Sequence, residues 1–161
     1  MADDREILTY ERFGEAAREL ASAVALDGYR PDAIVAIARG GLTLAGALGY
    51  ALDVKMLGSL NVEFYTGVDE RLAEPVVLPP TLDRDSLTGK RVLLVDDVAD
   101  SGRTLALVLQ LLQAGGGEVR TVCLYAKPHT VQEPDYVWRR TDRWIMFPWS
   151  SQGPVEYPAG R

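Results

Sequence analysis

One continuous stretch, VLLVDDVADSGRT at Val92–Thr104, constrains the fold of this chain more than any other. Its first part, Val92–Val95, is apolar and runs directly into two carboxylates, Asp96 and Asp97; a small polar turn then leads into the apolar, helical pattern of Leu105–Leu112. A short apolar run bounded by turn residues is typical of a buried strand in a parallel sheet. Because open α/β sheets bind ligands at the carboxyl ends of their strands, the stretch predicts an α/β fold with a binding site at this turn.

The turn combines groups that suit different parts of a ligand. Backbone N–H groups at the start of a helix, together with the hydroxyls of Ser101 and Thr104, form a cradle for phosphate. Asp96 and Asp97 repel phosphate, but they suit the hydroxyls of a sugar or a divalent cation. The simpler alternative is a strand that ends in two solvated acids, with Ser and Gly as a helix cap.

The whole stretch resembles the signature of the type I phosphoribosyltransferases, which bind 5-phosphoribosyl-1-pyrophosphate (PRPP). The resemblance implies that the two acids hold the ribose hydroxyls, that Asp97 lies close to a Mg²⁺ cofactor, and that the turn holds the 5′-phosphate. The residues that it implies for PRPP binding are Asp96, Asp97, Ala99, Asp100, Ser101, Gly102, Arg103 and Thr104.

A second turn, Arg39-Gly40-Gly41, follows the apolar run Ala33–Ile37 and should therefore reach the same end of the sheet. The guanidinium is a fixed fork of donors, and two glycines allow backbone amides to approach an anion closely. The resemblance implies that Arg39 and Gly40 bind pyrophosphate and that the Ala38–Arg39 peptide bond is cis. The alternative is an ordinary strand-to-helix turn with a surface arginine.

The last part of the chain resembles the bacterial xanthine–guanine phosphoribosyltransferases through the sequences AKP, DRWI and PW at residues 126–128, 142–145 and 148–149. The resemblance implies that Lys127 contacts the 6-oxygen of a purine, that Trp144 stacks on the ring, and that Ile145 contacts the base through its backbone. The alternative for Trp144 is burial in the core under the tail, which is the usual role of aromatic side chains.

Asp100 is the residue on which the interpretation of base specificity depends. An acid at this position resembles the branch of the family that uses 6-oxopurines, and it implies a catalytic residue that takes a proton from N7. The alternative is that Asp100 caps the following helix. Met146 and Ser150 stand where the xanthine–guanine enzymes carry acids, so guanine, xanthine and hypoxanthine stay open, as does a second metal site. His129, Arg71 and Arg84 are assigned no role.

The order of the apolar runs and helical patterns predicts a mainly parallel twisted sheet flanked by helices, with a small C-terminal hood. We expect a single phosphoribosyltransferase domain over residues 1–161, with a core at about 1–126, a hood at about 127–161 and a lid loop at about 66–84. Thr9 is expected to cap the first helix. The expected strands are residues 33–37, 54–64, 92–95 and 119–126, and the expected later helices are residues 42–52 and 105–112.

The formal net charge of −6 disfavours a surface that binds nucleic acid. One cysteine, Cys123, excludes a disulfide framework, and no apolar run is long enough to span a membrane. The N-terminus lacks the apolar region of a signal peptide. We therefore expect a cytoplasmic protein that binds neither nucleic acid nor membrane, and the resemblance implies a homodimer or homotetramer.

The expected activity is a Mg²⁺-dependent transfer of the 5-phosphoribosyl group from PRPP to N9 of a 6-oxopurine. The products are a purine nucleoside monophosphate and pyrophosphate, as in purine salvage. Two alternatives stay open: a phosphoribosyltransferase with another base specificity, and a regulatory protein of the same fold that binds PRPP or a nucleotide.

Overall fold

The computed structural model describes residues 4–64, 75–77 and 82–160. Its helices are α1 (Tyr10–Leu26), α2 (Gly41–Ala51) and α3 (Arg103–Ala114), with a single 3₁₀ turn, η2, at Arg84–Leu87. The strands are β1 (Glu6–Ile7), β2 (Ala33–Ala38), β3 (Leu57–Phe64), β4 (Pro75–Val77), β5 (Arg91–Ala99), β6 (Glu118–Ala126), β7 (Tyr136–Arg140) and β8 (Ile145–Met146). Within these residues, no helix is both long and apolar enough to cross a lipid bilayer.

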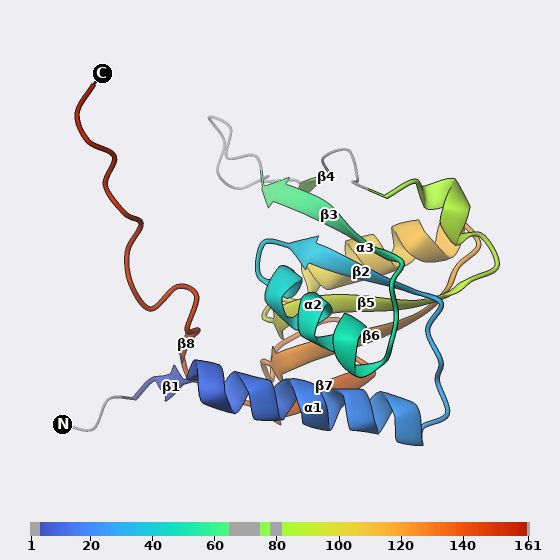
Figure 1. Ribbon diagram of the computed structural model, residues 1–161, viewed down its shortest axis with the longest axis horizontal. Coiled ribbons are helices and arrows are strands. Elements are labelled where there is room, and N and C mark those ends of the chain that lie inside the picture. Colours follow the sequence, from blue (N-terminus) through green and yellow to red (C-terminus); the bar gives the residue numbers. More distant parts are fainter. Residues whose placement is uncertain (1–3, 65–74, 78–81, 161) are drawn as a thin grey trace.

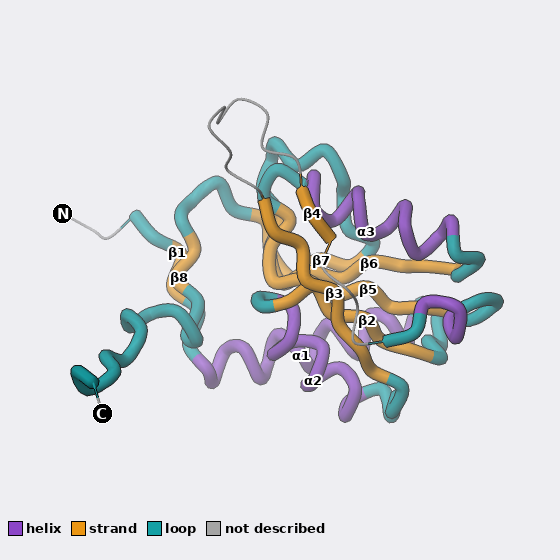
Figure 2. Tube along the Cα trace, turned by 90° about the horizontal axis from the view of Figure 1, so that it is seen from above, coloured by secondary structure: helices purple, strands orange, loops and turns teal. Residues whose placement is uncertain are grey.

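The centre of the molecule is a sheet with the strand order β4-β3-β2-β5-β6-β7, in which β4 alone is antiparallel to its neighbour (Figure 1). Figure 2 shows α1 and α2 on one side of this sheet and α3 on the other. The predicted fold class, a mainly parallel sheet flanked by helices, is confirmed. The carboxyl ends of β2, β5 and β6 lie together at one edge, so the turns that follow them are neighbours.

The two faces of the sheet are sorted by alternation along each strand. In β2, Ile34 and Ala36 pack in the core under α1 and α2, whereas Val35 and Ile37 pack in the core under α3. This burial on both faces explains why the central strands are continuous apolar runs. Cys123 is fully buried in β6, as expected.

Helix α1 begins where the sequence predicts. Thr9 is its N-cap, and the Thr9 side chain accepts a hydrogen bond from the Arg12 N–H at 3.2 Å. The side chains at helical spacing on the inner face are all buried: Phe13, Ala16, Ala17, Leu20 and Val24. This packing fixes α1 against α2 and the β7 end of the sheet.

Two segments differ from the prediction. Strand β5 does not stop at Val95: it continues to Ala99, and Ala99 pairs with Ala126 of β6. Part of the segment expected to form the hood, β7, instead extends the main sheet in parallel with β6. Of the tail, β8 instead pairs with β1, and residues 151–160 are exposed and run away from the body (Figure 1).

The predicted lid lies largely outside the described residues, as does Arg71. Within it, residues 75–77 form β4, paired antiparallel with β3, and Arg84 begins η2. The stretch between β3 and β5 therefore holds more regular structure than its prolines and glycines predict.

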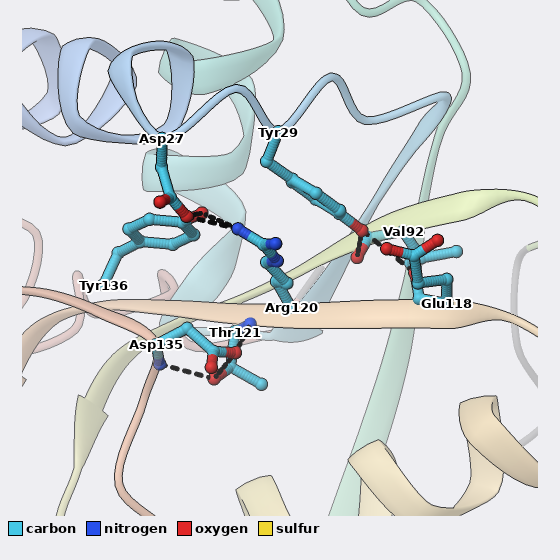
Figure 3. A network of polar contacts seen from close by, with 8 residues as sticks. All are labelled: Asp27, Tyr29, Val92, Glu118, Arg120, Thr121, Asp135 and Tyr136. Atoms are coloured by element: carbon cyan, nitrogen blue, oxygen red, sulfur yellow. Dashed lines mark hydrogen bonds and ion pairs between the residues drawn. The ribbon is translucent and has the colours of Figure 1, made fainter.

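Polar side chains close the amino end of the sheet over the last turn of α1 (Figure 3). Arg120 contacts the Asp27 carboxylate and donates to the Tyr136 hydroxyl at 2.8 Å, and that hydroxyl donates to Asp27 at 2.7 Å. The Tyr29 hydroxyl lies 2.9 Å from the carbonyl oxygens of both Val92 and Glu118. The carboxylate of Asp27 therefore has both a cation and a hydroxyl beside it.

Candidate functional site

Three adjoining clefts open at the carboxyl ends of the central strands. The first, of about 210 Å³, we call the turn cleft; it is lined by Ile37, Ala38, Val62, Asp96, Val98, Ala99, Asp100, Ser101, Gly102, Thr104 and Leu105. The arginine cleft, of about 580 Å³, is lined by Arg39, Gly40, Leu42, Thr43, Asp97, Phe147, Trp149 and Ser150. The tryptophan cleft, of about 550 Å³, is lined by Val98, Asp100, Lys127, His129, Asp142, Trp144, Ile145, Met146, Phe147 and Ser150.

The clefts share lining residues, so they lie next to one another. Asp100 lines both the turn cleft and the tryptophan cleft, and Phe147 and Ser150 line both the tryptophan cleft and the arginine cleft. A further hollow of about 590 Å³ lies over Ile7 and Tyr10; it adjoins the tryptophan cleft at Met146 and the arginine cleft at Trp149. Among the described residues, no charged side chain lines that hollow.

The turn between β5 and α3 depends on a glycine. Gly102 is the N-cap of α3 and has φ +79°; a Cβ there would also lie 2.3 Å from Thr130 Oγ1. Gly102 makes no side-chain cap; the Arg103 N–H donates to Ser101 Oγ at 3.3 Å, and Ser101, Gly102 and Thr104 all line the turn cleft. The alternative in which Asp100 caps α3 is wrong, because its carboxylate contacts His129 instead.

Asp96 and Asp97 are half-buried side by side at the end of β5. Burial raises the pKa of Asp96 well above its usual range, and the charge of Asp97 raises it further; burial also raises the pKa of Asp97. Their partners are backbone N–H groups: Asp97 N–H donates to Asp96 at 2.9 Å, and Val98 N–H donates to Asp97 at 2.8 Å. Among the described residues, no lysine or arginine forms an ion pair with either.

This donor set fits Mg²⁺. Two carboxylates without a cation favour a hard divalent ion, which binds oxygen and commonly keeps water or substrate phosphate as its other ligands. In the described part of the chain, no cluster of three or more histidine, cysteine or acidic side chains is placed to hold a metal. A magnesium ion beside Asp97 would therefore take its remaining ligands from substrate and water.

The turn after β2 lies directly against these acids. The Ala38–Arg39 peptide bond is cis, as expected. A Cβ on Gly40 would lie 2.3 Å from Asp97 Oδ2, and one on Gly41 would lie 2.3 Å from the Val95 carbonyl oxygen. Only glycines therefore allow this backbone to approach β5, and the approach brings the exposed Arg39 and Asp97 into one cleft.

The tryptophan cleft brings together the residues expected to contact a base. Trp144 is 75% exposed, so the alternative in which it is buried in the core is wrong. Trp149 is packed instead, stacked on Phe147 with ring centroids 5.0 Å apart. Lys127 donates to the carbonyl oxygen of Arg143, and Ile145 is buried behind the cleft.

His129 is a residue of this cleft that sequence reasoning left without a role. Its Nε2 lies 2.8 Å from Asp100 Oδ1. The signal was present in the strand order: the ends of adjacent parallel strands meet, and Asp100 and His129 follow the paired residues Ala99 and Ala126 at such ends.

Comparison with known proteins agrees with this geometry. The family of the phosphoribosyl transferase domain matches residues 4–153. A xanthine-guanine phosphoribosyltransferase of Gluconobacter oxydans is 35% identical over 89% of this chain and 83% of that protein. The crystal structure of a purine phosphoribosyltransferase from Pyrococcus horikoshii has a TM-score of 0.82 and 36% identity, and the match covers 97% of this chain and 100% of that one.

A third comparison, with the xanthine-guanine-hypoxanthine phosphoribosyltransferase of Helicobacter pylori, gives a TM-score of 0.77 and 26% identity, over 90% of this chain and 93% of that one. The family match spans the strands, the turns and the hood that build the three clefts. The chain therefore belongs to the phosphoribosyltransferase family of enzymes, among relatives that are named for purine bases.

Proposed function

We propose that this enzyme transfers the 5-phosphoribosyl group from PRPP to N9 of a 6-oxopurine. The observation that carries the proposal is that the three clefts adjoin one another at Asp100, Phe147 and Ser150. A phosphate cradle, a pair of carboxylates, an exposed arginine and an exposed tryptophan line these adjoining clefts. A substrate with a phosphate, a diol and a pyrophosphate matches three of these features, and a flat heterocycle matches the fourth.

PRPP extends, in this proposal, from the turn cleft to the arginine cleft. The N–H groups at the start of α3, with Ser101 and Thr104, hold its 5′-phosphate. Asp96 and Asp97 accept hydrogen bonds from the ribose hydroxyls, and Arg39 with the Gly40 backbone holds the pyrophosphate. The close approach of Gly40 to Asp97 supports this placement of PRPP, because it puts the groups proposed to hold the pyrophosphate next to those proposed to hold the ribose.

Magnesium is the cofactor in this proposal, held by Asp97 with Asp96 adjacent. When bound, the ion supplies positive charge next to the pyrophosphate leaving group. It would also remove the repulsion between two buried carboxylates that no protein cation relieves among the described residues.

The base occupies the tryptophan cleft, against the face of Trp144 and near Lys127, which donates to the 6-oxygen. N9 forms a bond to C1′ as the bond from C1′ to the pyrophosphate oxygen breaks, and the bonding pair leaves on pyrophosphate. The proton on N7 passes to Asp100, which lines both the cleft of the sugar phosphate and the cleft of the base.

The direct test is to incubate the protein with PRPP, Mg²⁺ and either guanine, xanthine, hypoxanthine or adenine, and to separate the products by chromatography. We expect a nucleoside monophosphate from at least one 6-oxopurine and none from adenine. Conversion of adenine would favour the alternative of another base specificity. PRPP binding without any product would favour the alternative of a regulatory protein.

We propose further that the enzyme is cytoplasmic and acts as a homodimer or homotetramer. Val155 and Tyr157 support self-association, since they are 83% and 91% exposed in a tail that runs away from the body. Light scattering on the full chain and on a chain that ends at Ser151 tests this. A full chain that is monomeric at every concentration would contradict it.

A further inference from the structure

The loop of residues 127–132, after β6, is fastened to the turn after β5. Lys127 N–H donates to the Ala99 carbonyl, and Val131 N–H donates to the Ser101 carbonyl, both at 2.9 Å. Between these bonds, Gly102 approaches Thr130 so closely that no side chain fits. The backbone on both sides of Asp100 is therefore tied to the loop that carries His129.

His129 makes a direct contact with Asp100 on this frame. Its Nε2 lies 2.8 Å from Oδ1, and both side chains, about two-thirds exposed, line the tryptophan cleft. An ionised carboxylate can only accept a hydrogen bond, so the imidazole carries its proton on Nε2 in this contact. Oδ1 is then occupied, and Oδ2 is the oxygen left for a ligand.

We infer that His129 is a positioning residue for Asp100 in the transfer reaction, an inference that rests on the proposed function. The imidazole donates from Nε2 to Oδ1 and so turns Oδ2 toward the base. As N9 bonds to C1′ and pyrophosphate departs, the N7 proton passes to Oδ2, and His129 keeps its own proton. An oriented base is the general arrangement in which one group takes the proton and a second group fixes its geometry.

The competing account is an exposed ion pair that affects neither rate nor specificity. A double-mutant cycle separates the two accounts. His129→Leu removes the donor, His129→Gln can still donate from its amide, and Asp100→Asn removes the base. Lys127 and Asp142 are the other charged groups that line this cleft, and all variants keep them. Val131→Ala is the matched control, because Val131 is 73% exposed in the same loop and only its backbone contacts the turn.

We expect His129→Leu to lower kcat about tenfold with the KM for PRPP within about twofold, and His129→Gln to recover most of the loss. In the Asp100→Asn background, His129→Leu should have no further effect. An unchanged kcat in His129→Leu, or the same loss in both backgrounds, would overturn the inference.

A second measurement reports on the pair without activity. His129 is the only histidine in the chain, so its imidazole nitrogens give an unambiguous NMR signal. We expect a proton on Nε2, and a shift of both nitrogen signals in Asp100→Asn. An Nε2 that carries no proton, or signals that Asp100→Asn leaves unchanged, would overturn the inference even in an active enzyme. If the parent makes no nucleotide, the proposed function fails, and these signals still decide whether the pair exists.

Discussion

The pKa values of acidic residues are shifted in opposite directions at the two ends of the sheet. At the amino end, Asp27 lies among Tyr136 and Arg120, and Asp32 faces Arg91 (Figure 3 shows the Asp27 group). The Tyr136 hydroxyl and Arg120 lower the pKa of Asp27, and hydrogen bonds from Arg91 lower the pKa of Asp32. At the carboxyl end, burial raises the pKa of Asp96 instead.

This contrast indicates that the acids at the amino end stabilise the fold, whereas those at the carboxyl end are arranged to bind a ligand. A carboxylate with its own cation contributes to stability, whereas a buried carboxylate beside another acid costs stability until an external cation or donor arrives. Both ends are built from the same strands, so the difference lies in which side chains the residues at each end carry. Changes at the carboxyl end should alter the reaction, and changes at the amino end should alter stability alone.

The largest effect is expected from Asp100→Asn. Asn is close to Asp in size but cannot take a proton, so turnover with any 6-oxopurine should fall about 10²–10⁴-fold. PRPP binding with Mg²⁺ should stay near that of the parent. Single-turnover kinetics and PRPP titration measure the two quantities separately. Turnover within a few-fold of the parent would remove Asp100 from the list of catalytic residues.

The next effect is expected from Trp144→Ala. Stacking of a base on an aromatic ring contributes roughly 1–3 kcal/mol, so the KM for the purine should rise about 5- to 150-fold while the KM for PRPP stays nearly constant. Tyr50→Ala is the control, because Tyr50 is 95% exposed at the far end of α2. Equal losses for both substrates would show that Trp144 supports the site as a whole.

Asp96→Asn should stabilise the protein while it damages the reaction. At pH 7 the raised pKa of Asp96 means that its ionisation costs stability, a cost that appears as the pH rises above the ordinary carboxyl value of about 3.9. In chelator, the melting temperature of Asp96→Asn should exceed that of the parent at pH 7, and the difference should shrink toward pH 4. A lower melting temperature at pH 7 would contradict the contrast between the two ends.

The smallest effect, with the opposite sign, is expected from Asp27→Asn. The folded protein lowers the pKa of Asp27, so ionised Asp27 stabilises the fold at pH values above the ordinary pKa of a carboxyl group. This stabilisation is lost as the pH falls through the lowered pKa of Asp27 in the folded protein. Asp27→Asn should therefore melt a few degrees below the parent at pH 7 and converge with it in acid, with kcat unchanged.

Asp53→Asn is the matched control for this variant, since it removes the same charge from an exposed position without an ion pair among the described residues. A loss of kcat in Asp27→Asn would break the separation between the two ends.

The sequence predicted the parts of the fold that local patterns encode. Apolar runs marked β2 and β6, and helical spacing after Thr9 marked α1. It did not predict β7, because the YVWRR of an edge strand has neither a continuous apolar run nor a buried alternation. It ended β5 too early, because acids at the end of an apolar run are typical of a turn, and only pairing with β6 keeps these residues extended.

In the candidate site, too, the sequence predicted the local motifs but not the contacts between separate loops. The turn after β5 is contiguous in sequence and was therefore recognisable, and so were the turns that contain Arg39 and Trp144. The contact between Asp100 and His129 joins residues from two separate loops, and it depends on the register of β5 and β6. The predicted parallel strands place both loops at one end of the sheet, but a single sequence does not give the register that brings these two residues into contact.

The short pairing of β1 with β8 has a practical consequence. Glu6 N–H donates to the Trp144 carbonyl at 2.9 Å, and Leu8 N–H donates to the Met146 carbonyl at 3.0 Å. β1 thus holds in place the segment that presents Trp144 to the tryptophan cleft. Removing or crowding residues at the N-terminal end weakens the pairing of β1 with β8, whereas residues 151–160 do not line any of the three clefts. An affinity tag for purification or immobilisation therefore belongs at the C-terminal end, where it does not disturb the pairing of β1 with β8.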